Sequence, residues 1–185
     1  MVSYQRESLC EEMMALNLLM SDVPINVTLP DEAENRYIDL SQKKISNCVG
    51  CFGCWVKTPG KCVIRDDAVS IYPLIAQSSK VIYVSKICYG SYDIVMKTML
   101  ERALPVQQAF IRLYQGETHH FQRNVAEKEA VIIAYGDLSE ESRELFQRLI
   151  ARNSKNMAFK KWEIFFVSEN EVENTVQREV DKWKK

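Results

Sequence analysis

The stretch Val81-Ile-Tyr-Val-Ser85 is a continuous, mainly apolar run of the kind found in a strand that is covered on both faces. A second run, Ala130-Val-Ile-Ile-Ala-Tyr135, has the same character. Segments with helical spacing precede and follow these runs, as the crossovers between parallel strands require. The alternation predicts an α/β fold, in which a parallel sheet lies between layers of helices.

The same pattern continues along the chain. We expect strands near 36–40, 81–85, 129–135 and 161–167, and helices near 67–78, 91–104, 139–152 and 171–183. No internal repeat or low-complexity segment interrupts them, and 185 residues suffice for one core. We therefore expect a single domain over residues 1–185.

The N-terminus departs from this regularity. Ser8 and Glu11 form a capping-box signature, and Leu9, Met13, Leu16 and Met20 continue it as an apolar stripe, which predicts a helix. A short β-prone stretch at 25–29 follows. A strand before this helix would be short or missing.

Composition narrows the classes of partner. The chain carries 24 Lys and Arg against 25 Asp and Glu, so no large field of one sign favours nucleic acid or an anionic membrane. No apolar run has the length of a membrane span, and the N-terminus does not resemble a signal peptide. We expect a cytoplasmic protein with a small-molecule partner, in which the six cysteines stay reduced.

A cysteine loop at 47–63 carries the most specific chemistry in the sequence. Four thiols, those of Cys48, Cys51, Cys54 and Cys62, follow a C-x2-C-x2-C-x7-C spacing. Such closely spaced thiolates suit an iron–sulfur cluster, and we predict one four-iron four-sulfur centre there. Four free thiols or a zinc site are the alternatives, whereas disulfides would close very small rings.

These residues resemble the flavodoxin-like NADPH-dependent FMN reductases, in the branch that includes the iron–sulfur flavoproteins. The similarity covers about residues 36 to 135 and rests on the cysteine loop, the Cys-Val-Ile-Arg-Asp-Asp tail that follows it, residues 81–85, the turn at Tyr89-Gly90, and the segment from Lys97 to Arg102. It implies a flavodoxin-like strand order of 2-1-3-4-5, bound FMN, a homo-oligomer, and electrons from NAD(P)H or a ferredoxin-like donor.

The resemblance also implies where FMN binds, at the carboxyl edge of the sheet. The loop expected to hold the flavin ring comprises Lys86, Ile87, Cys88, Tyr89, Gly90 and Ser91, and the turn at Gly136 is a further candidate. Arg6 and Ser8 are candidates for the phosphate, because a capped helix start binds anions, although Ser8 also serves as a plain helix cap. Cys88 and Tyr89 have core packing as their alternative role.

Two classes of function follow. The first is an FMN-dependent oxidoreductase that passes electrons from NAD(P)H to a small-molecule acceptor, and it needs little acid–base machinery because the cofactor carries the chemistry. The second is a non-enzymatic flavodoxin-like binding module that has lost the phosphate loop. The sequence does not identify the acceptor or distinguish NADH from NADPH.

Overall fold

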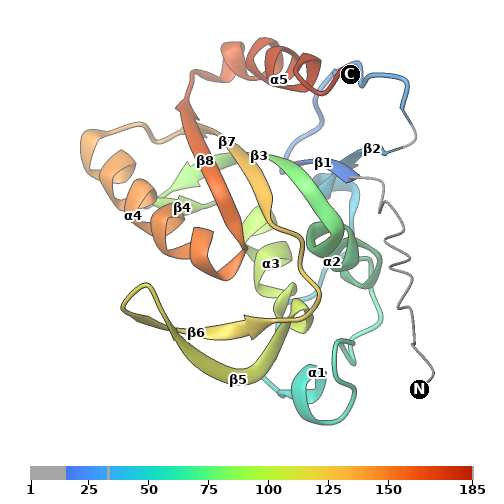
Figure 1. The fold of residues 1–185 in the computed structure, drawn as a ribbon. Helices are drawn as coiled ribbons and strands as arrows, with labels where there is room; N and C mark the ends of the chain where they lie inside the picture. The colour runs from blue at the N-terminus through green and yellow to red at the C-terminus, as the bar shows by residue number, and fades with distance from the viewer. Residues whose placement is uncertain (1–15, 33, 185) are drawn as a thin grey trace, which may run out of the picture.

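The computed structural model describes residues 16–32 and 34–184 (Figure 1). Its main sheet has the strand order β2-β1-β3-β7-β8, and every neighbouring pair along this path is parallel. The strands are β1 (Leu16–Ser21), β2 (Asn35–Asp39), β3 (Ser78–Cys88), β7 (Lys128–Gly136) and β8 (Phe159–Phe166). The predicted α/β fold is confirmed, and the four segments expected to form the sheet all do so.

The helices cover the two faces of this sheet unequally (Figure 1). One face packs against three helices, α2 (Ala68–Gln77), α3 (Ile94–Glu101) and α4 (Glu140–Asn156), around a core that includes side chains from β1 and β3. The other face has a smaller core under α5 (Val172–Asp181). Because successive strand residues point to opposite faces, neighbours such as Leu18 and Leu19 in β1 belong to different cores.

The first strand corrects our interpretation of the N-terminus. Residues 16–21, which we predicted as the end of a helix, form β1 in the middle of the sheet, so the first strand is present. Leu16, Leu18, Leu19 and Met20 fit both a helix stripe and a short strand buried on both faces. These residues form a strand because they pair with β2 and β3, and no local sequence pattern could show that pairing.

The connection from β1 to β2 has no helix in its described part, and the expected strand at 25–29 does not form. Instead this segment lies extended on the α5 side of the sheet, where Ile25, Val27 and Leu29 pack against the smaller core. Its backbone is bound by α5, since Asn26 N donates to Glu173 at 2.8 Å and Thr28 N donates to Gln177 at 2.9 Å. The segment thus covers part of the face that α5 leaves open.

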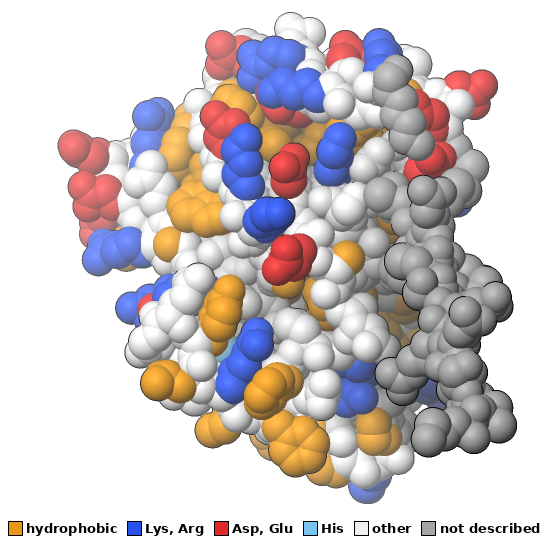
Figure 2. All heavy atoms as spheres, viewed as in Figure 1, with side chains coloured by type: hydrophobic (Ala, Val, Ile, Leu, Met, Phe, Trp, Pro, Cys, Tyr) orange, Lys and Arg blue, Asp and Glu red, His pale blue; other side chains and the backbone are white. Residues whose placement is uncertain are grey.

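A two-stranded arm was not predicted. Strands β5 (Gln107–Tyr114) and β6 (Glu117–Gln122) form an antiparallel hairpin apart from the main sheet, beside the short helix α1 (Gly53–Val56) of the cysteine loop. Several apolar side chains on this arm are exposed, among them Phe110, Ile111 and Leu113. Figure 2 shows hydrophobic side chains at the surface over this part of the molecule.

The remaining elements are short. They are β4 (Ser91–Tyr92), which pairs antiparallel with the end of β3, and three 3-10 turns, η1 (Leu40–Gln42), η2 (Leu104–Val106) and η3 (Glu169–Glu171). No helix in the described part of the chain is long and apolar enough to cross a membrane.

Candidate functional site

The carboxyl ends of β1, β3 and β7 meet at one edge of the sheet, where doubly wound folds bind their ligands. A pocket of about 350 Å³ opens there against α5. Its lining comes from the segments that follow the strands and from the start of α5: Asp22, Val23, Pro24, Ile25, Lys86, Asp93, Tyr135, Glu169, Val172 and Glu173. This pocket is the candidate site that the fold predicts.

Asp22 is the central group of the pocket and the first residue after β1. It is only 5% exposed, and its carboxylate accepts hydrogen bonds from the backbone N of Lys86 at 2.6 Å, from Ser85 Oγ at 3.0 Å and from Tyr135 Oη at 2.9 Å. Burial raises the pKa of Asp22 above its usual value, and these hydrogen bonds only partly offset that rise. Donors from the ends of two strands, β3 and β7, therefore converge on a carboxylate that follows a third strand, β1.

Three backbone N–H groups in the segment after β1 already donate to side chains of the protein. Ile25 N donates to Tyr37 Oη at 3.1 Å, while the amides of Asn26 and Thr28 bind side chains of α5. A phosphate site needs several such donors aimed at one point. Among the described residues, the loop after β1 does not fit the phosphate of FMN.

The charges around the pocket lead to the same result. Asp93, Glu169 and Glu173 line it together with Asp22, and Lys86 is the one cation in that lining. Lys86 Nζ lies 4.0 Å from a carboxylate oxygen of Glu169, and both side chains are largely exposed. The pocket repels a phosphate dianion, whereas an uncharged ring system carries no such penalty.

The predicted flavin-ring loop, residues 86–91, is a β-hairpin. Cys88 pairs with Ser91, and the turn residues Tyr89 and Gly90 have φ of 52° and 69°. A Cβ on Gly90 would lie 2.6 Å from Cβ of Leu145, so the turn packs tightly against α4. Of the predicted residues in this loop, Lys86 lines the pocket, Ile87 is buried, and Tyr89, at 93% exposed, points to solvent.

Gly136 ends β7 beside the same loop. It pairs with Ile87, has φ of 96°, and would place a Cβ 2.7 Å from Cγ of Lys86. A glycine is therefore required for close packing of the two strand ends. Arg6 and Ser8, the predicted phosphate ligands, lie outside the described residues and precede β1, whereas phosphate loops of this fold follow the first strand.

The cysteine loop is fixed to the body by Arg102. This guanidinium, 1% exposed, donates to both carboxylate oxygens of Asp66 at 2.6 and 2.9 Å, to the Ser46 carbonyl at 2.7 Å and to Cys62 Sγ at 3.5 Å. The pKa of Asp66 is lowered, because these hydrogen bonds outweigh the effect of its burial. Asp66 and Arg102 position the loop and take no part in the pocket.

The thiols themselves do not form a metal site in this arrangement. Cys48 and Cys51 are exposed and Cys54 and Cys62 half-buried, and no group of three or more metal-ligating side chains gathers in the described part of the chain. Burial, and then the neighbouring thiols, raises the pKa of Cys54 above its usual value. The sequence predicts ligands of the right chemistry for a cluster, but the structure does not support the cluster.

Sequence reasoning points to Tyr135, which precedes Gly136 in the turn named as a further candidate, but it misses Asp22. Asp22 follows residues that the sequence predicts as a helix. A buried strand at 16–21 followed directly by an acidic residue is the signal that could have identified it.

Comparisons with known proteins extend these observations. No protein-family model matches the chain. The chain is 40% identical to an iron-sulfur flavoprotein of Archaeoglobus fulgidus over an alignment of 72 residues. This alignment covers 39% of the chain and 32% of that protein. Over 86 residues, it is 28% identical to an iron-sulfur flavoprotein of Methanocaldococcus jannaschii, covering 46% and 44%. The chain thus spans less than half the length of these curated relatives.

Solved structures show the same class of fold. An FMN-dependent NADH-azoreductase from Bacillus anthracis, in complex with FMN, aligns with a TM-score of 0.57 at 10% identity over 92% of the chain and 97% of that protein. An NAD(P)H:quinone oxidoreductase from Methanothermobacter marburgensis aligns with a TM-score of 0.52 at 7% identity, over 91% and 94%. These matches confirm the flavodoxin-like fold and the resemblance to iron–sulfur flavoproteins that the sequence indicated.

Proposed function

We propose that this chain is a flavin-dependent oxidoreductase of the NAD(P)H-dependent FMN reductase or iron–sulfur flavoprotein type, which passes electrons to a small acceptor. The observation that carries the proposal is the pocket at the carboxyl edge of a flavodoxin-like sheet. The names of the curated relatives support the same chemistry. A bound flavin supplies the redox reaction, and the protein supplies the surface that orients it.

The described residues restrict how a flavin can be held. Ser85, Lys86 and Tyr135 already donate their hydrogen bonds to Asp22, and the pocket lining is acidic. The phosphate of a flavin therefore finds no stabilising interaction at this edge. We therefore propose that the ring supplies the affinity. Riboflavin should bind at least as tightly as FMN, in contrast to a protein with a phosphate loop.

A fluorescence titration of the purified chain with FMN and with riboflavin tests this proposal. We expect quenching by both, and Asp22→Asn should raise the affinity for FMN relative to riboflavin because it removes a charge next to the phosphate. Asp31→Asn, at an exposed position away from the pocket, is the control and should leave the ratio unchanged. If FMN binds the unaltered chain far more tightly than riboflavin, the phosphate is held after all. If neither flavin binds, the oxidoreductase proposal fails.

A second candidate is the non-enzymatic flavodoxin-like module, and the geometry of Asp22 favours it specifically. A carboxylate with three hydrogen bonds completes the edge without a ligand, and the hairpin at 88–91 packs against α4. The same titration separates the two candidates. Colourless protein that ignores both flavins supports the module, whereas yellow protein or quenching supports the oxidoreductase.

A four-iron four-sulfur cluster at Cys48, Cys51, Cys54 and Cys62 stays a prediction. Its support is the cysteine spacing and the fact that the curated relatives are iron-sulfur flavoproteins, and it requires the loop to gather its thiols more closely than in the structure. Anaerobic reconstitution with iron counting and electron paramagnetic resonance tests it. Cys54→Ser should lower the retained iron, while Cys88→Ser, outside the loop, should not.

The electron donor and the assembly also remain proposals. NADH and NADPH can be compared by anaerobic reduction of flavin-loaded protein, and a reduced ferredoxin serves as the alternative donor. A homo-oligomer is tested by light scattering of the purified chain.

A further inference from the structure

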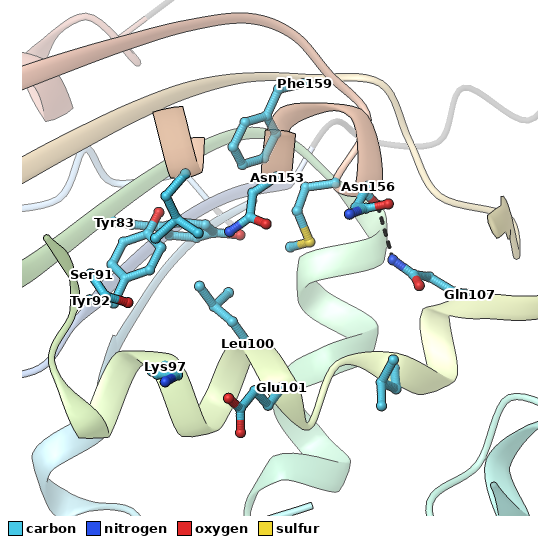
Figure 3. Close-up of a pocket in the computed structure, with 13 residues that line it drawn as sticks. Tyr83, Ser91, Tyr92, Lys97, Leu100, Glu101, Gln107, Asn153, Asn156 and Phe159 are labelled. Carbon is cyan, nitrogen blue, oxygen red and sulfur yellow. Dashed lines mark hydrogen bonds between the residues drawn. The ribbon is translucent and has the colours of Figure 1, made fainter. Parts of the chain in front are cut away.

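A second cavity, of about 320 Å³, lies on the other face of the sheet, between α3 and α4 (Figure 3). Its lining includes two buried tyrosines, Tyr83 and Tyr92, and five half-buried apolar side chains, those of Leu100, Leu104, Leu149, Met157 and Phe159. The charged side chains in the lining, Lys97 and Glu101, are exposed and stand at its mouth. This volume is at the lower end of the range of about 300–1,000 Å³ that small-molecule sites occupy.

Tyr83 of β3 supplies the innermost polar group. The residue is 1% exposed, and its hydroxyl has no hydrogen-bond partner among the described residues. Burial raises the pKa of Tyr83 well above its usual value, so the hydroxyl stays protonated as a donor. Buried hydroxyls without a partner are rare because each costs free energy. The hydroxyl of the neighbouring Tyr92 lines the same cavity, but no described group accepts a hydrogen bond from Tyr83.

The other polar groups of the lining differ in how they are used. Asn156 is bound to the arm, since its side-chain oxygen contacts His119 Nδ1 at 2.8 Å and its carbonyl accepts from Gln107 and Gln122. Asn153 is half-buried, and Figure 3 shows its amide reaching from α4 into the space above Leu100. The cavity therefore offers the unpaired Tyr83 hydroxyl and one adaptable amide, with the buried Tyr92 beside them.

We propose that the cavity between α3 and α4 binds an uncharged, ring-sized organic molecule whose carbonyl oxygen accepts a hydrogen bond from Tyr83. The apolar lining favours a hydrocarbon ring, and the absence of a buried cation near Tyr83 in the described lining disfavours a carboxylate or phosphate. This site is separate from the carboxyl-edge pocket, which lies on the α5 side. It holds whether or not the chain binds flavin.

The test uses two probes that differ only in the carbonyl, 1-tetralone and tetralin, in isothermal titration with the purified chain. We expect 1-tetralone to bind the unaltered protein about tenfold more tightly, the effect of one hydrogen bond to a buried donor. Tyr83→Phe keeps the ring and the fold, and it should reduce 1-tetralone to the affinity of tetralin without changing tetralin. Equal affinities of the two probes for the unaltered protein, or a preference that survives Tyr83→Phe, would overturn the proposal.

Two further variants keep the result interpretable. Tyr135→Phe removes a buried hydroxyl at the carboxyl-edge pocket and should leave the affinity for both probes unchanged. Leu104→Trp fills the cavity from η2 and should abolish binding of both. Failure of either probe to bind the unaltered protein, or binding that persists in Leu104→Trp, would also contradict the assignment.

Discussion

Tyr83 and Tyr135 stand on neighbouring central strands, and their hydroxyls have opposite surroundings. The Tyr135 hydroxyl, on the α5 side, donates to Asp22 at 2.9 Å, within a network that also takes up Ser85 and Lys86. The Tyr83 hydroxyl, on the side of α3 and α4, has no partner in the described part of the chain. At the carboxyl edge the protein's own groups pair with one another, whereas the second cavity holds a buried hydroxyl without a partner among the described residues.

The largest effect should come from Asp22, because it completes the carboxyl edge. Asp22→Leu leaves three donors without their acceptor, so we expect the free energy of unfolding to fall by about 3–5 kcal/mol. Urea denaturation followed by circular dichroism measures it. Asp31→Leu, at an exposed position, should change it by less than about 0.5 kcal/mol. Equal effects of the two variants would show that the network contributes no stability.

The hairpin that closes the predicted flavin loop gives the next effect. Gly90→Ala adds a Cβ in a backbone of positive φ and against Leu145, and should cost about 2–3 kcal/mol. The matched control is Gly116→Ala in the turn of the arm, where φ is 79° and nothing lies within 4 Å of the added Cβ. It should cost about 1 kcal/mol from the backbone alone. If both variants lose the same stability, the hairpin does not pack on α4 as described.

Removing the hydroxyl from each of the two tyrosines should change the free energy of unfolding in opposite directions. Tyr135→Phe removes a hydrogen bond to a buried carboxylate and should lower the free energy of unfolding by about 1–2 kcal/mol. Tyr83→Phe removes a hydroxyl without a partner and should leave the protein unchanged or raise its stability by up to about 1 kcal/mol. Thermal unfolding of both variants provides the measurement. A clear loss of stability in Tyr83→Phe would mean that its hydroxyl has an acceptor.

The smallest effect concerns pH. The pKa of Asp22 is raised above 3.8 in the folded protein. At a pH between 3.8 and the folded-state pKa, the folded protein therefore keeps a proton on Asp22 that the unfolded chain has lost. Over that range, the stability contributed by Asp22 therefore falls as the pH rises, and it is constant above the folded value. The difference in unfolding free energy between the unaltered protein and Asp22→Asn should decrease across this range. A difference that grows with pH would show that the pKa of Asp22 is lowered instead.

Much of the architecture was predictable from local sequence. The runs at 81–85 and 130–135 are apolar enough to be buried on both faces, and Ser139 with Glu140 and Glu141 marks the start of α4. The cysteine loop and the resemblance to the FMN reductases were likewise visible in the residues. These features depend on neighbours in the chain, so the sequence alone determines them.

Tertiary pairing decided the rest. Residues 16–21 suit a helix or a strand, and only contact with β2 and β3 makes them the central strand that carries Asp22 to the carboxyl edge. The pairing of Tyr135 with Asp22 and the isolation of Tyr83 depend on which face of the sheet each side chain meets, and on helices far away in the chain. Whether a buried polar group finds a partner is a property of packing in three dimensions, which no local pattern encodes.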